Sequence, residues 1–337
     1  MMSRKAAGLA IVWCGLLGGA LPAFAASGTP AAAPASVPTL LQRMTHALES
    51  LNYTGNFVYL HQGELEAMHV VHRVDAHGDE ERLTSLTGTP REVIRKHKSV
   101  ECVLPRKQMI IVHDYRPESR FPIILAPHSD TRDLSKYYQL KRLGHQRTAG
   151  RDCVVVALQP KDDYRYGYRL WLDAKTDLLL RSELVGTGGT TIERVMFTHV
   201  ELPDKIPPDE IKPSVDTHGF IRRPPDAGDA PAGTGRNVTV KVGELPPGYK
   251  LTVDEMQHLA DMDAPVRHLV FTDGLASLSV FATPHKDGKD ALSGPSSRGP
   301  VNAYGRLLDG YQITVVGEVP AATVKLVAQS VEIDKRE

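Results

Sequence analysis

A helix is predicted near residue 40, because apolar residues recur there with a helical period. They fall on one face when the chain is wound at about 3.6 residues per turn. These residues are Leu40, Leu41, Met44, Leu48 and Leu51. Asn52 and Gly55 follow, and these residue types take the left-handed backbone that often ends a helix. The pattern therefore predicts one amphipathic helix that ends close to residue 52.

From Phe57 to residue 201 the chain is expected to form strands. Short runs rich in Val, Ile, Tyr and Thr alternate with Gly, Pro, Asp or Asn, which favour turns. The predicted strands span residues 56–61, 66–75, 79–87, 91–104, 108–115, 151–160, 164–173, 177–186 and 190–201. One helix is expected at 130–142, with Asp130 or Thr131 as its cap. Consecutive strands without intervening helices predict an antiparallel sheet.

A second, smaller domain is predicted after a linker. Residues 204–236 are rich in Pro and Gly and lack periodicity, which is typical of an interdomain linker. Residues 237–337 are expected to contain a mobile loop at 284–300, a strand at 311–317 and a helix that opens at Pro320.

The Asp273-Gly274 dipeptide predicts a hairpin with a two-residue turn, since both positions of such a turn need a positive φ. That turn pairs Phe271 with Ala276 and Leu269 with Leu278. Apolar residues then share one face of the hairpin.

The first 26 residues have the three parts of a secretory signal peptide. Two basic residues precede an apolar run from Leu9 to Leu21, and Ala25 ends an A-x-A-type cleavage site. The alternative is a membrane-spanning anchor, but a span needs about 20 apolar residues and this run is shorter. We therefore expect residues 1–26 to be removed, residues 27–37 to form a flexible tether, and the soluble protein to reside in the periplasm.

Two cysteines remain after removal of Cys14 with the signal peptide. An even number of cysteines in an oxidising compartment favours a disulfide between Cys102 and Cys153. The alternative is two separately buried thiols that pack as small apolar side chains.

Charge and motifs argue against several classes of function. Lys and Arg together number 40, as do Asp and Glu, so no net charge favours a nucleic-acid partner. The sequence has no G-x-S-x-G, H-E-x-x-H, P-loop or C-x-x-C pattern. His69 and His72 face opposite sides of a predicted strand and do not chelate one metal. We therefore expect no enzyme activity, no catalytic residue, no metal, no cofactor and no nucleic-acid partner.

Some predicted strands are apolar on both faces, so each face of the sheet must be covered. The segments Met109–Val112 and Cys153–Leu158 show this pattern. The two predicted helices can cover one face, and a lipid or a partner segment can cover the other. The alternative is an ordinary core on both faces, which the pattern alone favours slightly.

Several motifs, in their order and spacing, resemble the MucB/RseB family of periplasmic regulators of the envelope-stress sigma factor. They are Tyr53-Thr-Gly-Asn-Phe-Val-Tyr59, Arg91-Glu-Val-Ile94, Tyr164-Arg-Tyr-Gly-Tyr-Arg-Leu-Trp-Leu-Asp173, Thr272-Asp-Gly-Leu275 and Ile313-Thr-Val-Val-Gly-Glu-Val-Pro320. The resemblance extends from about residue 38 to the C-terminus.

The resemblance implies a mainly β, α+β fold. Residues 38–203 would form an unclosed antiparallel β-barrel with helices, similar to LolA and LolB, and residues 237–337 a small domain that binds the anti-sigma factor. The implied function is negative regulation: the protein binds the periplasmic region of a single-span anti-sigma factor of the RseA or MucA type and shields it from the site-1 protease. Lipid-like signals such as lipopolysaccharide would release it, with the 204–236 linker as the hinge.

Two other functions stay open. The same barrel suits a periplasmic lipid or lipoprotein carrier, and a hydrolase with an unrecognised site is a third class. A homodimer is also compatible with the resemblance.

Candidate binding residues are chosen by residue type within this family framework. The lipid-slot candidates are Phe57, Tyr59, Met109, Ile111, Tyr168 and Trp171. The candidates for anti-sigma contact are Phe271, Tyr304 and Tyr311, although each suits a core position equally well.

Overall fold

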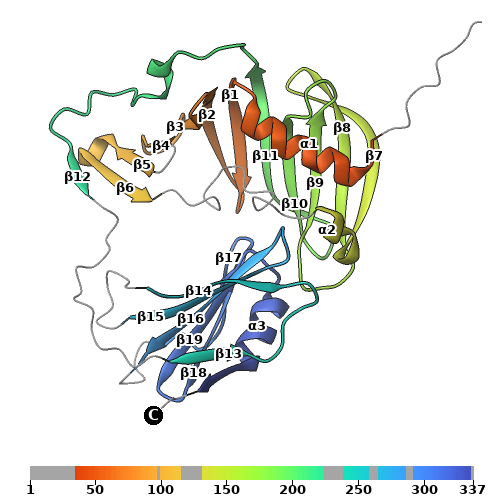
Figure 1. Cartoon of the computed structure of the whole chain (residues 1–337), viewed down its shortest axis with the longest axis vertical. Coiled ribbons are helices and arrows are strands. Elements are labelled where there is room, and N and C mark those ends of the chain that lie inside the picture. Colours follow the sequence, from red (N-terminus) through yellow and green to blue (C-terminus); the bar gives the residue numbers. More distant parts are fainter. Residues whose placement is uncertain are drawn as a thin grey trace, which may run out of the picture. The chain divides into compact units, whose positions relative to one another are not determined.

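Twelve strands pair into one open sheet in the N-terminal part of the chain (Figure 1). The computed structural model describes residues 35–96, 99–114, 131–223, 238–257, 265–285 and 291–334. The strand order is β12-β6-β5-β4-β3-β2-β1-β11-β10-β9-β8-β7, and neighbours are antiparallel except β12 and β6. The described strands therefore form an unclosed, mainly antiparallel sheet, as the sequence predicted for this part of the chain.

The elements of this part, with two short 3-10 turns, are α1 (Val37–Ser50), β1 (Tyr53–His61), β2 (Glu64–Asp75), β3 (Gly78–Ser85), β4 (Glu92–Lys96), β5 (Ser99–Leu104), η1 (Pro105–Lys107), β6 (Met109–Asp114), α2 (Thr131–Tyr137), β7 (Tyr138–Thr148), β8 (Arg151–Pro160), β9 (Gly167–Asp173), β10 (Leu179–Val185), β11 (Thr191–Glu201), η3 (Pro208–Ile211) and β12 (Ile221–Arg223).

Helix α1 forms where the apolar period predicted it. The Ser36 hydroxyl caps its start by accepting a hydrogen bond from the Thr39 amide, 3.3 Å away. The side chains that it buries are Leu40, Leu41, Met44 and Ala47. Its end differs from the prediction, because Leu51 follows in an extended conformation. Gly55 lies inside β1, where a Cβ atom would come within 2.4 Å of the His199 carbonyl oxygen.

One predicted strand and one predicted helix needed correction. The single strand expected at 91–104 is two antiparallel strands, β4 and β5. The helix expected at 130–142 ends at Tyr137, and β7 begins at the next residue. Strand β7 lies at an edge of the sheet and is exposed along most of its length. It therefore lacks the apolar alternation that identifies a half-buried strand.

The C-terminal part is a smaller α+β domain with a six-stranded and a two-stranded sheet. Its elements are β13 (Thr239–Val242), β14 (Lys250–Gln257), β15 (Val266–Thr272), β16 (Ser277–Pro284), β17 (Gly294–Arg298), β18 (Val301–Leu308), β19 (Tyr311–Gly317), α3 (Ala321–Ser330) and β20 (Val331–Asp334). The six strands follow the order β14-β15-β16-β19-β18-β17, and β13 pairs with β20. Helix α3 packs on β18 and β19, and Val324 and Val327 reach the apolar core.

The hairpin of β15 and β16 differs from the prediction by two residues. Phe271 pairs with Leu278, and the turn spans four residues, 273–276. Asp273 stabilises this longer turn, since its Oδ1 accepts hydrogen bonds from the amides of Leu275 and Ala276 at 2.9 and 2.8 Å. A shift of two keeps the same residues on the core face.

Two further differences concern loops. The loop expected at 284–300 contains strand β17, and residues 286–290 lie outside the described ranges. The linker expected at 204–236 contains η3 and β12, and residues 224–237 lie outside the described ranges. The signal peptide and most of the tether also fall outside them. Within the described parts of the chain, no helix has the length and apolar character needed to span a membrane.

Candidate ligand pocket and partner surface

One face of the open sheet carries a row of apolar side chains from β6 to β2. Antiparallel register partners point to the same face. The pairs are Ile111 with Cys102, Cys102 with Val93, Val93 with Leu83, and Leu83 with Val70. On β1 the row continues between Tyr53 and Phe57, next to Gly55. The strand register therefore builds a continuous apolar surface.

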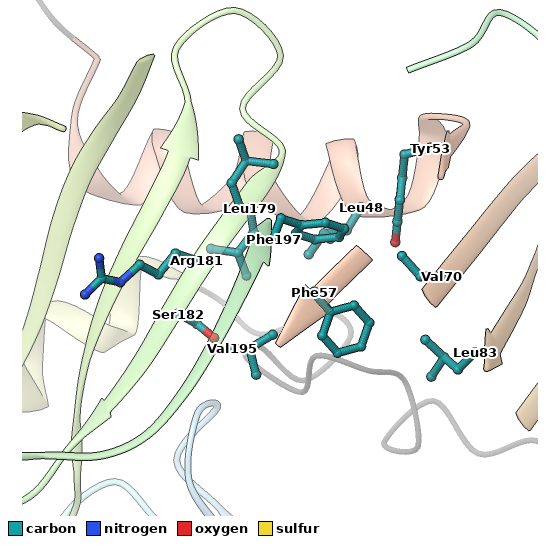
Figure 2. A pocket seen from close by; sticks show the side chains of 11 residues that line it. Leu48, Tyr53, Phe57, Val70, Leu83, Leu179, Arg181, Ser182, Val195 and Phe197 are labelled. Carbon is teal, nitrogen blue, oxygen red and sulfur yellow. The ribbon is translucent and has the colours of Figure 1, made fainter. Parts of the chain in front are cut away.

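A pocket lies on this surface, where α1 crosses the sheet (Figure 2). Nine of its eleven lining residues are apolar or aromatic, and the lining comprises Leu48, Tyr53, Phe57, Val70, Leu83, Leu179, Leu180, Arg181, Ser182, Val195 and Phe197. Figure 2 shows Leu48 of α1 beside the Phe197 ring of β11, and the Arg181 guanidinium pointing away from the rings. The pocket is suited to an apolar ligand.

The pocket is nearly filled by its own side chains. Its cavity volume is about 20 Å³, which is room for roughly one water molecule. Small-molecule sites commonly have volumes of about 300–1,000 Å³. An acyl chain can therefore enter only if lining side chains or α1 move away from the sheet.

Buried polar groups hold the end of α1 and the pocket wall together. The ring of His72 stacks on Tyr53 at 4.6 Å between centroids. Its Nδ1 lies 2.8 Å from the Leu51 carbonyl oxygen, directly after α1, and its Nε2 lies 3.2 Å from an Asp79 carboxylate oxygen. Asp79 also accepts a hydrogen bond from Arg95 at 2.8 Å. This chain of contacts connects α1 to β2, β3 and β4.

The structure brings together some of the lipid-slot candidates. Phe57 lines the pocket, and Trp171 belongs to the same buried apolar cluster. Met109 and Ile111 lie on the same sheet face on β6, which is five strands away from β1 in the sheet order. Tyr59 stacks on His61 at 4.5 Å and bonds to Glu193, and burial is the main cause that raises its pKa.

Tyr168 lies apart from the pocket. It is buried, and burial followed by the charges of Glu318 and Asp273, both in the C-terminal domain, raises its pKa. Several pocket residues were missed in the sequence, among them Leu83, Val195 and Phe197. Alternation within the predicted strands marks them as inward-facing, but residue type does not distinguish a pocket from a core.

The three residues expected to contact an anti-sigma factor face the core of the small domain. Phe271 is 4% exposed and belongs to the cluster beneath α3. Tyr304 and Tyr311 are half-buried against the same cluster. Their side chains stabilise the domain, and their role in partner contact remains a prediction.

The structure contradicts the expected Cys102–Cys153 disulfide. Both thiols are free. Cys102 lies on β5 and Cys153 on β8, and seven strands separate these two in the sheet order. A disulfide needs Cα atoms within roughly 7 Å. Burial raises the pKa of both thiols. Cys153 is buried and packs as a small apolar group, as the alternative expected, whereas Cys102 is only half-buried.

The two domains also touch each other through buried polar groups. Arg165, in the segment between β8 and β9, forms an ion pair with Asp273 of the small domain, and both side chains are 0% exposed. The Thr323 hydroxyl at the start of α3 donates to the Tyr164 carbonyl oxygen at 2.8 Å. These groups lie outside the pocket.

Two protein-family models match the chain. The model for the MucB/RseB N-terminal domain matches residues 36–215, and the model for the MucB/RseB C-terminal domain matches residues 235–332. The chain belongs to the MucB/RseB family. The family resemblance noted in the sequence is thus confirmed, and so is the mainly β fold with a smaller C-terminal domain.

The curated relatives in this family are sigma factor regulators. The sigma factor AlgU regulatory protein MucB of Pseudomonas aeruginosa is 31% identical over 314 residues, covering 90% of this chain and 92% of that protein. The sigma-E factor regulatory protein RseB of Escherichia coli K12 is 29% identical over 314 residues, covering 91% of this chain and 92% of that protein.

Solved structures extend the similarity to the fold. A crystal structure of MucB in complex with MucA(peri) matches with a TM-score of 0.68 and 28% identity, covering 89% of this chain and 100% of that chain. A second crystal structure of MucB matches with a TM-score of 0.61 and 28% identity, covering 88% of this chain and 97% of that chain. One of these similar structures, MucB, is thus seen in complex with MucA(peri).

Proposed function

We propose that this chain is a periplasmic negative regulator of an envelope-stress sigma factor. It binds the periplasmic segment of a single-span anti-sigma factor of the MucA or RseA type, shields that segment from the site-1 protease and catalyses no reaction. The observation that carries the proposal is similarity over both domains to a MucB chain bound to MucA(peri), with 89% of this chain covered. Residues 1–26 direct export as a signal peptide and are then removed. The functional units are residues 38–203 and 237–337.

Lipid-like signals release the partner by opening the apolar pocket. A ligand shifts a protein between two arrangements only if it binds one of them better. The observed pocket is closed at about 20 Å³, so an acyl chain selects an arrangement in which α1 and Leu48 have moved. Each buried methylene contributes about 0.8 kcal/mol to that selection.

The decisive experiment is titration of the mature chain with the periplasmic segment of an anti-sigma factor from the same organism, with and without lipopolysaccharide. We expect binding that weakens when the lipid is present. Absence of binding under both conditions would refute the proposal. Protection is tested in parallel by the rate at which the site-1 protease cleaves the segment.

A pair of variants separates the pocket from the rest of the surface. Val195→Leu adds a methylene inside the pocket, and Val301→Leu adds one at an exposed position of β18. We expect Val195→Leu to bind the anti-sigma segment normally but to respond less to lipid, and Val301→Leu to behave as the wild type. An unchanged lipid response in Val195→Leu places the lipid site elsewhere.

The same pocket favours one second candidate, a lipid or lipoprotein carrier. Such a protein binds an acyl chain but no anti-sigma segment. In the titration above, lipid binding without capture of the segment would identify the carrier.

A further inference from the structure

Arg165 is a fully buried cation at the contact between the two domains. Its Nη1 lies 2.5 Å from Oδ2 of Asp273, on the turn between β15 and β16. Its Nη2 donates to the Pro247 carbonyl oxygen at 2.7 Å, also in the small domain. Nε donates to Oδ1 of Asp162, on its own side of the contact, at 3.0 Å. One guanidinium group thus binds both domains at once, through the planar fork that only arginine offers.

Aromatic rings surround this ion pair. The guanidinium carbon lies 5.1, 5.6 and 5.3 Å from the ring centroids of Tyr137, Tyr138 and Tyr249, within the range of cation–π attraction. The Tyr138 hydroxyl donates to Oδ2 of Asp273 at 3.2 Å. Next to Tyr249, Gly248 has a φ of +91°, and a Cβ atom there would lie 2.5 Å from the Tyr137 ring. The backbone of the small domain is therefore seated directly on a tyrosine of the sheet domain.

Both neighbours of Arg165 also contact the small domain. The Tyr164 carbonyl oxygen accepts the Thr323 hydroxyl. The Tyr166 hydroxyl donates to the Pro300 carbonyl oxygen at 3.2 Å and accepts from Asn302 at 3.0 Å. Asn302 in turn donates to the Val319 carbonyl oxygen at 2.7 Å. Residues 164–166 therefore contact four separate segments of the small domain, at Pro247, Asp273, Pro300 to Asn302 and Thr323.

We infer that Arg165 is a positioning residue that selects one orientation of the small domain on the open sheet. Tyrosine rings supply non-directional attraction between the domains, and an aromatic surface alone tolerates sliding. The ion pair does not tolerate it, because any other docked orientation leaves Arg165 or Asp273 as a buried charge without its partner. Only the orientation that aligns both groups is therefore populated.

This inference changes the role of the linker. The sequence placed the hinge at 204–236, yet the domains are fixed to each other by groups far from that segment. A partner segment that contacts both domains then meets a preformed surface and does not have to order two loosely tethered halves on binding. This consequence rests on the proposed function, whereas the fixed orientation does not.

The test uses the mature chain and three single variants. Arg165→Met removes the cation, and Asp273→Asn removes the anion while keeping an Oδ1 acceptor for the turn amides. Arg151→Met is the matched control, because it breaks the Arg151–Asp173 ion pair within the sheet domain. Small-angle X-ray scattering reports domain orientation, and thermal unfolding reports whether each domain is folded.

We expect Arg165→Met and Asp273→Asn to enlarge the radius of gyration and broaden the scattering distance distribution, with both domains still folded. Affinity for the anti-sigma segment falls at least tenfold in both, and the double variant falls no further, because both changes break one contact. The Arg151→Met control keeps wild-type scattering and affinity.

Wild-type scattering in both Arg165→Met and Asp273→Asn overturns the inference. It is also overturned if their losses of affinity add up in the double variant. If Arg165→Met fails to fold, Asp273→Asn alone decides the result. If the wild type does not bind the anti-sigma segment but Arg165→Met and Asp273→Asn still change the scattering, the proposed function fails and the positioning role stands.

Discussion

The ring of Phe57 on β1 meets the ring of Phe197 on β11 at 5.8 Å between centroids, with 58° between their planes. The two residues are register partners, so the pairing of the strands itself fixes the contact. Tyr53 approaches the same Phe197 ring edge-on, at 6.4 Å and 85°. Phe197 thus lies between two aromatic neighbours in the wall of the pocket.

Truncation of Phe197 is expected to open the pocket at a large loss of stability. Phe197→Ala removes a buried ring, which lowers the free energy of unfolding by about 3–5 kcal/mol. Urea denaturation measures this loss, and fluorescence of an apolar dye such as N-phenyl-1-naphthylamine should rise because the cavity grows. Phe220→Ala, in a separate apolar cluster, should leave dye binding unchanged. Equal dye binding in both variants contradicts a specific pocket.

Glu183 is expected to be the most sensitive acidic residue of the sheet. It is 1% exposed and forms ion pairs with Arg169, Arg181 and Arg194, the last at 2.7 Å. Burial opposes its ionisation, but the arginine hydrogen bonds and charges outweigh burial, so its pKa lies below the usual value. Glu183→Gln leaves three partly exposed guanidinium groups without their anion and should lower the free energy of unfolding by about 1–3 kcal/mol.

The pH dependence of this contribution follows from its sign. A lowered pKa stabilises the fold at pH values above the ordinary range of Glu, and the gain is lost as the pH falls through the lowered pKa. Denaturation at pH 7 and pH 3 should therefore show a smaller pH effect in Glu183→Gln than in the wild type. Glu201→Gln, on the exposed end of β11, serves as the control. An identical pH effect in Glu183→Gln would rule out this role.

Glu318 is expected to titrate near neutral pH. Glu318 is exposed, but crowding by the surrounding protein removes enough water from its carboxyl to raise its pKa from 4.5 to about 7, and the charge of Glu193 adds to the effect. A raised pKa means that the folded state favours the neutral carboxyl. Its contribution to stability is complete below about pH 4.5 and is lost as the pH rises through 7. Carboxyl carbon NMR should show this midpoint, and Glu193→Gln should lower it; a wild-type midpoint near 4.5 contradicts the prediction.

Both native thiols should be free and slow to react. The raised pKa values of Cys102 and Cys153 leave little thiolate at neutral pH. Alkylation of the folded, non-reduced protein followed by mass spectrometry should show little modification. After denaturation without reductant, two alkyl groups should be added to the mature chain. A mass that indicates no free thiol would restore the disulfide.

The elements that the sequence predicted best are those with at least one buried face. Helix α1 and the strands β8 and β19 carry clear periods, because burial selects apolar residues on one side or along the whole element. Edge strands such as β7 meet water on both sides and leave no such period. The hairpin at Asp273 shows a different limit, since an Asp-Gly pair allows several turn lengths and the carboxylate contacts that choose between them are not visible in the dipeptide.

The sites depend on relations that one strand does not contain. Phe57 was found because an aromatic residue on a strand is a plausible ligand contact, whereas Leu83 and Val195 become pocket residues only through the register of five strands. Arg165 falls between two tyrosines in the strand predicted at 164–173. Its partner Asp273 is 108 residues away in the sequence, and no local sequence pattern predicts a contact over that separation. The disulfide failed for the same reason, because compartment and number of cysteines say nothing about distance.

Strand β12 is only three residues long, yet it covers the backbone edge of β6. It pairs in parallel with Met109, Ile110 and Ile111 of β6. Without it, an apolar strand would end the sheet with open amide and carbonyl groups, a template to which a second chain could add. The segment after the sheet domain thus shields that edge, and a loss of this short pairing would first be seen as self-association of otherwise folded molecules.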